Sequence, residues 1–340
     1  MRKPPRDLSR FKKDLIELME GDLPEGSEDE ILHDMLYNVG QLRSEKLDIL
    51  ELRLLNTAFK ELRYALKIFK PYRDVPKAAV FGSARTTTDH ASFKIAEDFG
   101  RKLAKKNWMI ITGGARGIME AAMVGDGAKN SCGLTLMLPF EQTANPVILG
   151  NQKLIFFKYF FTRKLMFLKE SQSTVLFPGG FGTFDEGFES FTLVQTGKAK
   201  PRPLVLADAP KSGYWAALLE FLKVHMAGER LISPRDLSLI RHCQDMDQAV
   251  NEVTHFYENY DSSRFFKDYY LIRLKKRISD AALAQLSVEF KDMFTQGGIE
   301  RLTDVGEDQR GNPALERITF RFDRASYSRL RELIDRLNDL

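Results

Sequence analysis

The chain has 340 residues, of which 43 % are hydrophobic, and this composition is typical of a globular protein that forms one large domain or two of ordinary size. Its 51 lysines and arginines nearly balance 47 aspartates and glutamates, and the formal charge of +4 gives no support to a nucleic-acid or membrane partner. We find no signal peptide and no apolar run near the roughly 18 residues of a membrane-spanning helix, so a cytoplasmic location is expected.

Residues 1–74 are rich in charge and predict a helical segment. Between residues 46 and 70 the apolar residues recur at steps of three and four, which indicates an amphipathic helix. Because its polar face mixes both signs of charge, we expect the apolar face to pack on the same protein or on a second subunit. The apolar residues concerned are Leu47, Leu50, Leu54, Leu55, Phe59, Leu62 and Leu66.

Residues 75–260 alternate short, continuously apolar runs with helical segments. Five such runs separated by helices are typical of a parallel sheet that is covered on both faces. We therefore predict an α/β fold with a doubly wound parallel sheet. The strands are expected in KAAVFGS, WMIITGG, LTLMLP, STVLFPGG and PLVLAD, and the helices near residues 90–106, 117–129, 160–171 and 184–195.

Residues 261–340 have a different texture. The segments YYLIRLKKR (269–277) and RITFRFDR (317–324) alternate in polarity, and an amphipathic helix follows each, near residues 279–295 and 325–338. The polar residues 305–313 predict a loop. This part is expected to form a small α+β appendage, to which the sequence assigns no chemistry.

Three of the predicted strands end in turns that are rich in small residues. In a doubly wound sheet, ligands bind beyond the carboxyl ends of the strands, where backbone N–H groups and the positive end of a helix dipole point outward. The turns lack the GxGxxG and GxxxxGK[ST] spacings, so NAD-binding and ATPase functions lose their main support. The three turns are FGSAR (81–85), TGGARGIMEAA (112–122) and FPGGFGTFDE (177–186).

The third turn carries the clearest chemistry. Its glycines allow close approach of a ligand, and Thr183 adds a hydroxyl at the start of a helix, so together they predict a phosphate cradle. Glu186 follows about one helical turn later, where a carboxylate suits a ribose hydroxyl or a developing positive centre better than a phosphate. The glycines are Gly179, Gly180 and Gly182.

A strongly aromatic helix precedes this turn and carries Arg163 and Lys164. If the sheet order brings the helix beside the third turn, Arg163 can meet a phosphate or a nucleobase; otherwise both residues are solvated helix residues. The aromatic residues nearby are expected in the core or at a dimer interface, and less as a platform for stacking a base. These are Phe156, Phe157, Phe160, Phe161 and Phe167.

Several other residues near the strand ends have both a structural and a functional interpretation. Ser83 and Arg85 stand at the end of the first predicted strand, where a base or phosphate is within reach. Glu120 either reaches a ribose of the ligand or forms an ion pair within its own helix. Glu141 and Asn145 follow the third predicted strand, and Asn145 is as well explained as a turn residue as by contact with a ligand. The five histidines are dispersed, which argues against triad hydrolysis. Cys132 and Cys243 form no CxxC or Cys/His set, so reduced thiols are expected, with no disulfide and no zinc site. These two cysteines are far apart in the chain.

With these motifs the sequence resembles the LOG ("lonely guy") family, long labelled as lysine decarboxylases. PGGFGTFDE fits the family's PGGxGTxxE motif, TGGARGIMEAA is similar to its GGGxxGxM motif, and the Arg-Lys pair matches as well. The resemblance covers about residues 77–208, and the flanking segments look like a longer bacterial branch of the family. It departs from the family at Ala115 and Arg116, where a third glycine is common, and this leaves the base preference open.

The resemblance implies a Rossmann-like homodimer that splits nucleoside 5′-monophosphates into free base and ribose 5-phosphate, with active sites near the interface. It implies that Arg163 and Glu186 are catalytic and that the third turn, Gly179 to Thr183, holds the 5′-phosphate. No cofactor or metal is expected. Ser83, Gly113, Gly114 and Lys164 complete the expected substrate-binding set.

The chemistry agrees with this resemblance. Breaking a ribosyl C–N bond builds an oxocarbenium-like centre that a carboxylate such as Glu186 stabilises, and the leaving base needs a nearby proton or cation such as Arg163. Decarboxylation with pyridoxal phosphate would need a distinct Schiff-base lysine, which the sequence does not single out. The expected function is hydrolysis of a purine nucleotide. One alternative is a nucleotide sensor without catalysis, whose signal the terminal segments relay, and a third hypothesis is a hydrolase that the terminal segments regulate.

Overall fold

A computed structural model describes residues 8–21, 23–137, 144–302 and 312–340. The chain divides into two units, residues 1–60 and residues 61–340. In the part of the chain that the structure describes, no helix has both the length and the apolar character needed to cross a membrane.

The first unit consists of helices. Ser27 caps the second helix by accepting a hydrogen bond from the amide of Glu30 at 3.1 Å. Several apolar residues of the predicted amphipathic helix are exposed, among them Leu54 and Phe59 at 42 % and 52 %. The helices are α1 (Leu8–Glu20), α2 (Glu28–Ser44) and α3 (Ile49–Phe69), of which α3 continues into the second unit.

The second unit is built on a sheet of seven strands in the order β4-β3-β2-β1-β5-β6-β7, and every pair of neighbours is parallel. The doubly wound α/β fold is confirmed, but two of the seven strands were not predicted. The segment LIFF of β4 runs into the aromatic helix that follows, and IRHC of β7 carries polar residues at the edge of the sheet. The strands are β1 (Lys77–Phe81), β2 (Met109–Thr112), β3 (Ser131–Leu136), β4 (Leu154–Phe157), β5 (Ser173–Leu176), β6 (Leu204–Ala207) and β7 (Ile240–Cys243).

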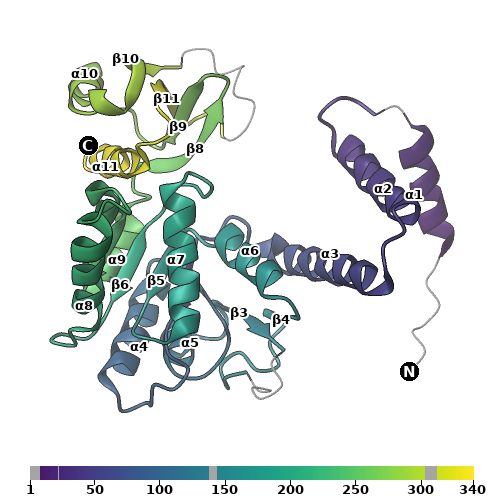
Figure 1. Cartoon of the computed structure of the whole chain (residues 1–340), viewed down its shortest axis with the longest axis horizontal. Helices are drawn as coiled ribbons and strands as arrows, with labels where there is room; N and C mark the ends of the chain where they lie inside the picture. Colours follow the sequence, from purple (N-terminus) through teal and green to yellow (C-terminus); the bar gives the residue numbers. More distant parts are fainter. Residues whose placement is uncertain (1–7, 22, 138–143, 303–311) are drawn as a thin grey trace. The chain divides into compact units, whose positions relative to one another are not determined.

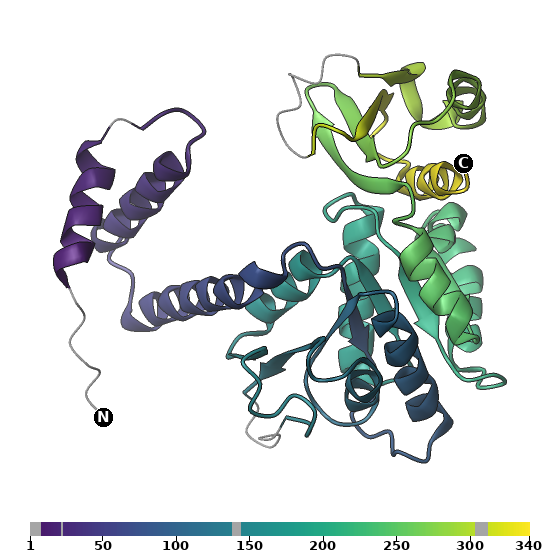
Figure 2. The ribbon, with the colours of Figure 1, turned by 180° about the vertical axis from the view of Figure 1, so that it is seen from behind.

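Helices cover both faces of this sheet, which is why its central strands are continuously apolar (Figure 1). Helices α4 (Ala91–Ala104), α5 (Ile118–Asp126) and α9 (Met246–His255) pack on one face (Figure 2). Three helices and the end of α3, through Ala65 and Phe69, pack on the other. These three are α6 (Phe160–Glu170), α7 (Phe181–Gln195) and α8 (Tyr214–Phe221), and the short helices are η1 (Lys70–Tyr72), η2 (Leu222–Ala227), η3 (Pro234–Leu239) and η4 (Lys291–Met293).

The strand order places a crevice between β1 and β5. The chain proceeds from β1 outward to β4 on one side and then returns to place β5 on the other side of β1, where Phe81 pairs with Leu176. The connections after these two strands therefore leave toward opposite sides of the sheet. Such a reversal of strand order marks the ligand-binding crevice of open α/β sheets, and the turns FGSAR and FPGG lie there.

The C-terminal appendage is a four-stranded antiparallel sheet in the order β10-β11-β9-β8, with a helix after each hairpin. The predicted strands correspond to β9 and β11, whereas β8 and β10 were not predicted. The loop expected at residues 305–313 lies mostly outside the described residues. The elements are β8 (Tyr260–Phe266), β9 (Tyr269–Leu274), α10 (Asp280–Glu289), β10 (Phe294–Arg301), β11 (Glu316–Phe322) and α11 (Tyr327–Asn338).

Buried polar contacts join α11 to helix α9 and to the segment that follows it. Arg331 is 2 % exposed and forms ion pairs with Glu252 of α9 and with Asp335. The side-chain oxygen of Asn338 accepts hydrogen bonds from the amides of Asn259 and Tyr260, both at 2.8 Å. The appendage is therefore held to the end of α9 by hydrogen bonds as well as by apolar contacts.

Candidate active site

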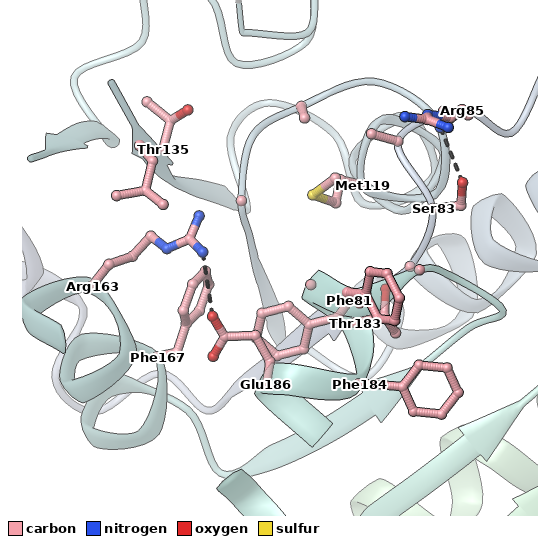
Figure 3. A pocket seen from close by; sticks show the side chains of 18 of the residues that line it. Phe81, Ser83, Arg85, Met119, Thr135, Arg163, Phe167, Thr183, Phe184 and Glu186 are labelled. Carbon is pink, nitrogen blue, oxygen red and sulfur yellow. Dashed lines mark hydrogen bonds and ion pairs between the residues drawn. The ribbon is translucent and has the colours of Figure 1, made fainter. Parts of the chain in front are cut away.

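A cavity of about 860 Å³ opens at the carboxyl ends of β1, β2 and β5 (Figure 3). Its volume lies in the range of sites that hold a small molecule. The cavity is lined by most of the residues that the sequence singled out, but Gly114, Lys164 and Gly179 are not among its lining residues. The expected residues on its wall are Ser83, Gly113, Arg163, Gly180, Gly182, Thr183 and Glu186.

Hydrogen bonds tie the three turns together. The amide of Ser83 donates to the carbonyl of Pro178 at 3.0 Å, and the carbonyl of Ser83 accepts from the amide of Ile118 at 3.0 Å. The Ser83 hydroxyl in turn accepts from the amide of Arg85 at 3.1 Å. The first turn therefore connects the other two turns by hydrogen bonds. Ser83 makes these bonds and also lines the cavity.

The second turn needs glycine at Gly114 and Gly117 for its backbone conformation and packing, whereas Gly113 lines the cavity. Gly114 and Gly117 have φ of +74° and +69°, and a Cβ at Gly117 would stand 2.3 Å from the carbonyl oxygen of Ser83. Asn145, which is fully buried, donates from Nδ2 to the carbonyls of Gly114 and Ala115 at 3.1 and 3.0 Å. Asn145 thus supports the turn, while Glu141 lies outside the described residues.

The third turn leaves open space in front of helix α7. Among the described residues, no atom would lie within 4 Å of a Cβ at Gly180 or Gly182, and none supplies a side-chain cap to the helix, which begins at Phe181. Gly179, in contrast, is closely packed: a Cβ at this residue would stand 2.1 Å from Thr183 Oγ1. The carbonyl of Gly179 accepts a hydrogen bond from the hydroxyl of Tyr214 at 2.5 Å. The positive end of the α7 dipole therefore faces a part of the cavity that is large enough for an anion.

Arg163 of α6 and Glu186 of α7 meet across the cavity, with Arg163 Nη2 3.3 Å from Glu186 Oε1 (Figure 3). The two side chains are only 16 % and 6 % exposed. The rings of Phe160 and Phe167 lie 5.3 and 5.6 Å from the guanidinium carbon of Arg163 and help to fix it. The sheet order thus brings α6 beside the third turn, and Arg163 is not a solvated surface residue.

Burial raises the pKa of Glu186, and the charges of Lys164 and Arg163 act in the opposite direction. The carboxylate therefore sits in a poorly solvated site and depends on its cations for its charge. Burial also acts to lower the pKa of Lys164, but hydrogen bonds to Glu189 and Asp185 outweigh burial, and the pKa of Lys164 is raised. Lys164 consequently remains a cation at neutral pH.

The wall of the cavity beyond the two catalytic candidates is mainly apolar. It combines methionine and aromatic side chains with one strand hydroxyl, that of Thr135, and with Arg85 of the first turn. Such a wall suits a planar ring with few polar edges. The larger apolar side chains include Phe81, Met119, Leu136, Met137, Phe156, Phe167 and Phe184. From the sequence, a stacking platform for a base was the less favoured interpretation of Phe156 and Phe167, and no site role was proposed for the other five.

Neither cysteine takes part in this site. Burial raises the pKa of Cys132 to about 12 and that of Cys243 to about 11, so both thiols stay protonated and unreactive. Within the described ranges no group of three histidine, cysteine or carboxylate side chains is placed to hold a metal ion.

Comparison with known proteins finds a family model and curated relatives that are similar to this chain in sequence. Residues 116–253 match the model of a family described as "Possible lysine decarboxylase". A cytokinin riboside 5′-monophosphate phosphoribohydrolase from Rhodococcoides fascians is 28 % identical over 186 residues, which are 53 % of this chain and 91 % of that protein. The cytokinin riboside 5′-monophosphate phosphoribohydrolase LOG3 from Arabidopsis thaliana is also 28 % identical, over 47 % of this chain and 74 % of its own length.

Among solved structures, a molybdenum cofactor carrier protein from Chlamydomonas reinhardtii is similar over 52 % of this chain and 94 % of its own. It is 21 % identical, with a TM-score of 0.36. The topology of the sheet itself establishes the fold of this chain.

Proposed function

We propose that the chain is a nucleoside 5′-monophosphate phosphoribohydrolase of the LOG family, which splits a purine nucleotide into free base and ribose 5-phosphate. One observation carries the proposal. The buried carboxylate of Glu186, paired with Arg163 at 3.3 Å, lies one helical turn behind the unobstructed start of α7 at Gly180 and Gly182. This arrangement offers an anion site and, about 5.4 Å further along α7, a carboxylate, which supports binding of a 5′-phosphate with its ribose beside Glu186.

In the proposed reaction the 5′-phosphate lies at the start of α7, against the amides near Gly180 and the hydroxyl of Thr183. The ribose then lies over Glu186, whose carboxylate stabilises the positive charge that develops at C1′ as the C–N bond breaks. Water forms the new C1′–O bond and releases a proton, and the leaving base nitrogen takes up a proton. Arg163 supports the negative charge on the leaving base and holds Glu186 in place.

The base is proposed to lie against the apolar wall, with Thr135 and Arg85 at its edges. We propose an AMP-like or cytokinin-type purine, because the relatives from Rhodococcoides fascians and Arabidopsis thaliana are named for cytokinin riboside 5′-monophosphate. A decarboxylase has less support, since among the described residues of the cavity wall none is a lysine that could form a Schiff base.

We also propose that the active form is a homodimer. Four apolar side chains of β4 and α6, beside the cavity, are about half exposed, and Phe181 at the cavity mouth is 95 % exposed. Exposed clusters of this kind are typical of protein interfaces. Light scattering coupled to size exclusion tests the dimer, and a monomer at micromolar concentration would contradict it. The four side chains are Phe156, Phe160, Phe161 and Leu165.

The experiment that tests the function is chromatographic detection of free base and ribose 5-phosphate from AMP, GMP, IMP, CMP, UMP and an N6-substituted AMP. Glu186→Gln and Arg163→Ala are each expected to lower kcat by about 100-fold or more, because each removes a charge that acts on the transition state. Glu97→Gln on α4, which changes a carboxylate paired with Arg101 away from the cavity, serves as the matched control.

Two outcomes would contradict the proposal. Release of no base from any nucleotide by a folded protein that binds nucleotide would favour a sensor without catalysis. Base release that both cavity variants retain would place the reaction elsewhere on the protein.

A further inference from the structure

Lys164 follows Arg163 on α6 but points into a different environment. Its ammonium Nζ lies 2.9 Å from Asp185 Oδ2, 2.8 Å from Glu189 Oε2 and 3.5 Å from Glu186 Oε2, all of which belong to α7. The Lys164 side chain is 16 % exposed and does not line the cavity. The sequence grouped Lys164 with the substrate-binding residues, whereas its contacts are with carboxylates behind the cavity wall.

The Glu186 carboxylate is consequently held at both oxygens by different cations. Arg163 contacts Oε1 from the cavity side, and Lys164 contacts Oε2 from the side where α6 and α7 meet. Arg163 lines the cavity, so a bound nucleotide competes for its guanidinium. Lys164 does not face that competition, because its two shorter contacts anchor it to α7 whether the cavity is filled or empty.

We infer that Lys164 is a positioning residue for the proposed hydrolase: without touching the nucleotide, it orients the Glu186 carboxylate toward the sugar and sustains its negative charge. This inference rests on the proposed function. It assigns the two members of the Arg-Lys pair to different tasks, with Arg163 at the reacting atoms and Lys164 behind Glu186.

The charges around Glu186 determine in which direction the pKa of Glu186 moves when Lys164 is replaced. The ionisable groups that face Glu186 are Arg163 and Lys164 of α6 and Asp185 and Glu189 of α7. Burial raises the pKa of Glu186, the two cations oppose it with Lys164 the stronger, and the two carboxylates raise it further. Loss of Lys164 therefore raises the pKa of Glu186 again, and less of the active carboxylate is present near neutral pH.

The test compares Lys164→Met and Lys164→Arg with wild type in pH profiles of kcat and KM for the best nucleotide. Lys164→Met is expected to lower kcat at pH 7 by about 10-fold and to move the acid limb up by about one pH unit, with KM within about twofold. Lys164→Arg restores the cation and is expected to recover most of kcat. Lys169→Met on the same helix, a half-exposed lysine paired with Glu170, is the matched control and leaves both parameters unchanged.

Asp185→Asn supplies a second variant that does not depend on tolerance of a methionine between the helices. Its side chain is 51 % exposed, and removal of its charge lowers the pKa of Glu186, so the acid limb moves to lower pH. Opposite shifts in the lysine and aspartate variants support the positioning role. A raised KM with unchanged kcat in Lys164→Met, or an acid limb that neither variant moves, would overturn it.

Carboxyl ¹³C NMR titration of Glu186 in the free protein separates this inference from the proposed function. The Glu186 resonance, assigned through Glu186→Gln, is expected to titrate at higher pH in Lys164→Met than in wild type even if no nucleotide is hydrolysed. An unchanged Glu186 titration in Lys164→Met would overturn the inference, whereas inactivity of wild type on every nucleotide would overturn only the proposed function.

Discussion

Two strand–turn–helix units border the cavity, β2 with α5 and β5 with α7, and each has glycines in its turn and a buried carboxylate in its helix. In the first unit Gly117 is pressed against the carbonyl of Ser83, and Asp126 near the end of the helix accepts hydrogen bonds from Ile110 and Ser131. All of these contacts are internal to the protein. The first unit therefore uses Gly117 to hold two turns together and the carboxyl group of Asp126 to hold β2 and the start of β3.

In the second unit the same residue types face outward. Gly180 and Gly182 border open space, and Glu186 reaches the cavity beside Arg163. The difference shows that a glycine-rich turn after a parallel strand carries no function by its composition alone. The contacts of each glycine and of the carboxylate that follows decide whether the turn serves the fold or a ligand, and substitutions at matched positions can separate the two.

The largest effect is expected for Gly117→Ala. Gly117 has φ +69° and ψ −132°, a conformation that is nearly restricted to glycine. The new Cβ would also stand 2.3 Å from the carbonyl oxygen of Ser83, a backbone atom that accepts a hydrogen bond from the amide of Ile118. We expect the free energy of unfolding in urea to fall by about 3 kcal/mol or more. Gly150→Ala is the matched control, because Gly150 has φ +77° but no atom within 4 Å, and it should lose only about 1 kcal/mol. Equal losses in the two variants would refute the packing role of Gly117.

The next effect concerns the buried carboxyl of α5. Burial raises the pKa of Asp126 to about 7, so the folded state keeps its proton between about pH 4 and pH 7, where the unfolded state has lost it. The contribution of protonated Asp126 to the free energy of unfolding is therefore fully present below about pH 4. It is lost as the pH rises through 7, at up to about 1.4 kcal/mol per pH unit. Asp126→Asn cannot ionise, so its stability relative to wild type should increase from pH 5 to pH 8.

Urea unfolding of wild type and Asp126→Asn at pH 5 and pH 8 measures this difference. Asp98→Asn changes a half-exposed carboxylate on the neighbouring helix α4 and is the control for a general loss of charge. If wild type and Asp126→Asn lose stability in parallel as the pH rises, Asp126 is not the group that titrates.

Much of this architecture follows from the sequence, because the central strands are buried on both faces and read as continuous apolar runs. The edge strands β4 and β7 do not carry that signal. LIFF is followed closely by the aromatic residues of α6, so the sequence shows no boundary between strand and helix. IRHC is only half-buried and contains polar residues, so it lacks the continuous apolar run that indicates a buried strand. The appendage strands β8 and β10 were missed for a similar reason, since each combines polar residues or glycines with only a few buried positions.

The candidate site likewise contains residues that the sequence predicts and residues whose role depends on how the elements pack. Arg163 and Glu186 stand in recognisable motifs, whereas the task of Lys164 depends on how α6 packs against α7, which the order of residues does not reveal. Thr135 and Met119 reach the cavity only because β3 and α5 end beside it. The sequence also could not separate the glycines that support packing from those that border the cavity, since that distinction rests on distances between turns.

The smallest effect tests the glycines of the second unit. Gly182→Ala places a methyl group in open space in the first turn of α7, where alanine favours the helix by up to about 1 kcal/mol over glycine, so stability should be unchanged or slightly higher. If a phosphate occupies that space, KM for the nucleotide should rise by about 10-fold, the equivalent of roughly 1.4 kcal/mol, with kcat nearly unchanged. Inhibition by inorganic phosphate should weaken by a similar factor, because phosphate shares the cradle but not the ribose or base contacts. A variant as stable as wild type that keeps its KM and its sensitivity to phosphate would show that the open glycines do not border the anion, and the contrast between the two turns would then lie in their carboxylates alone.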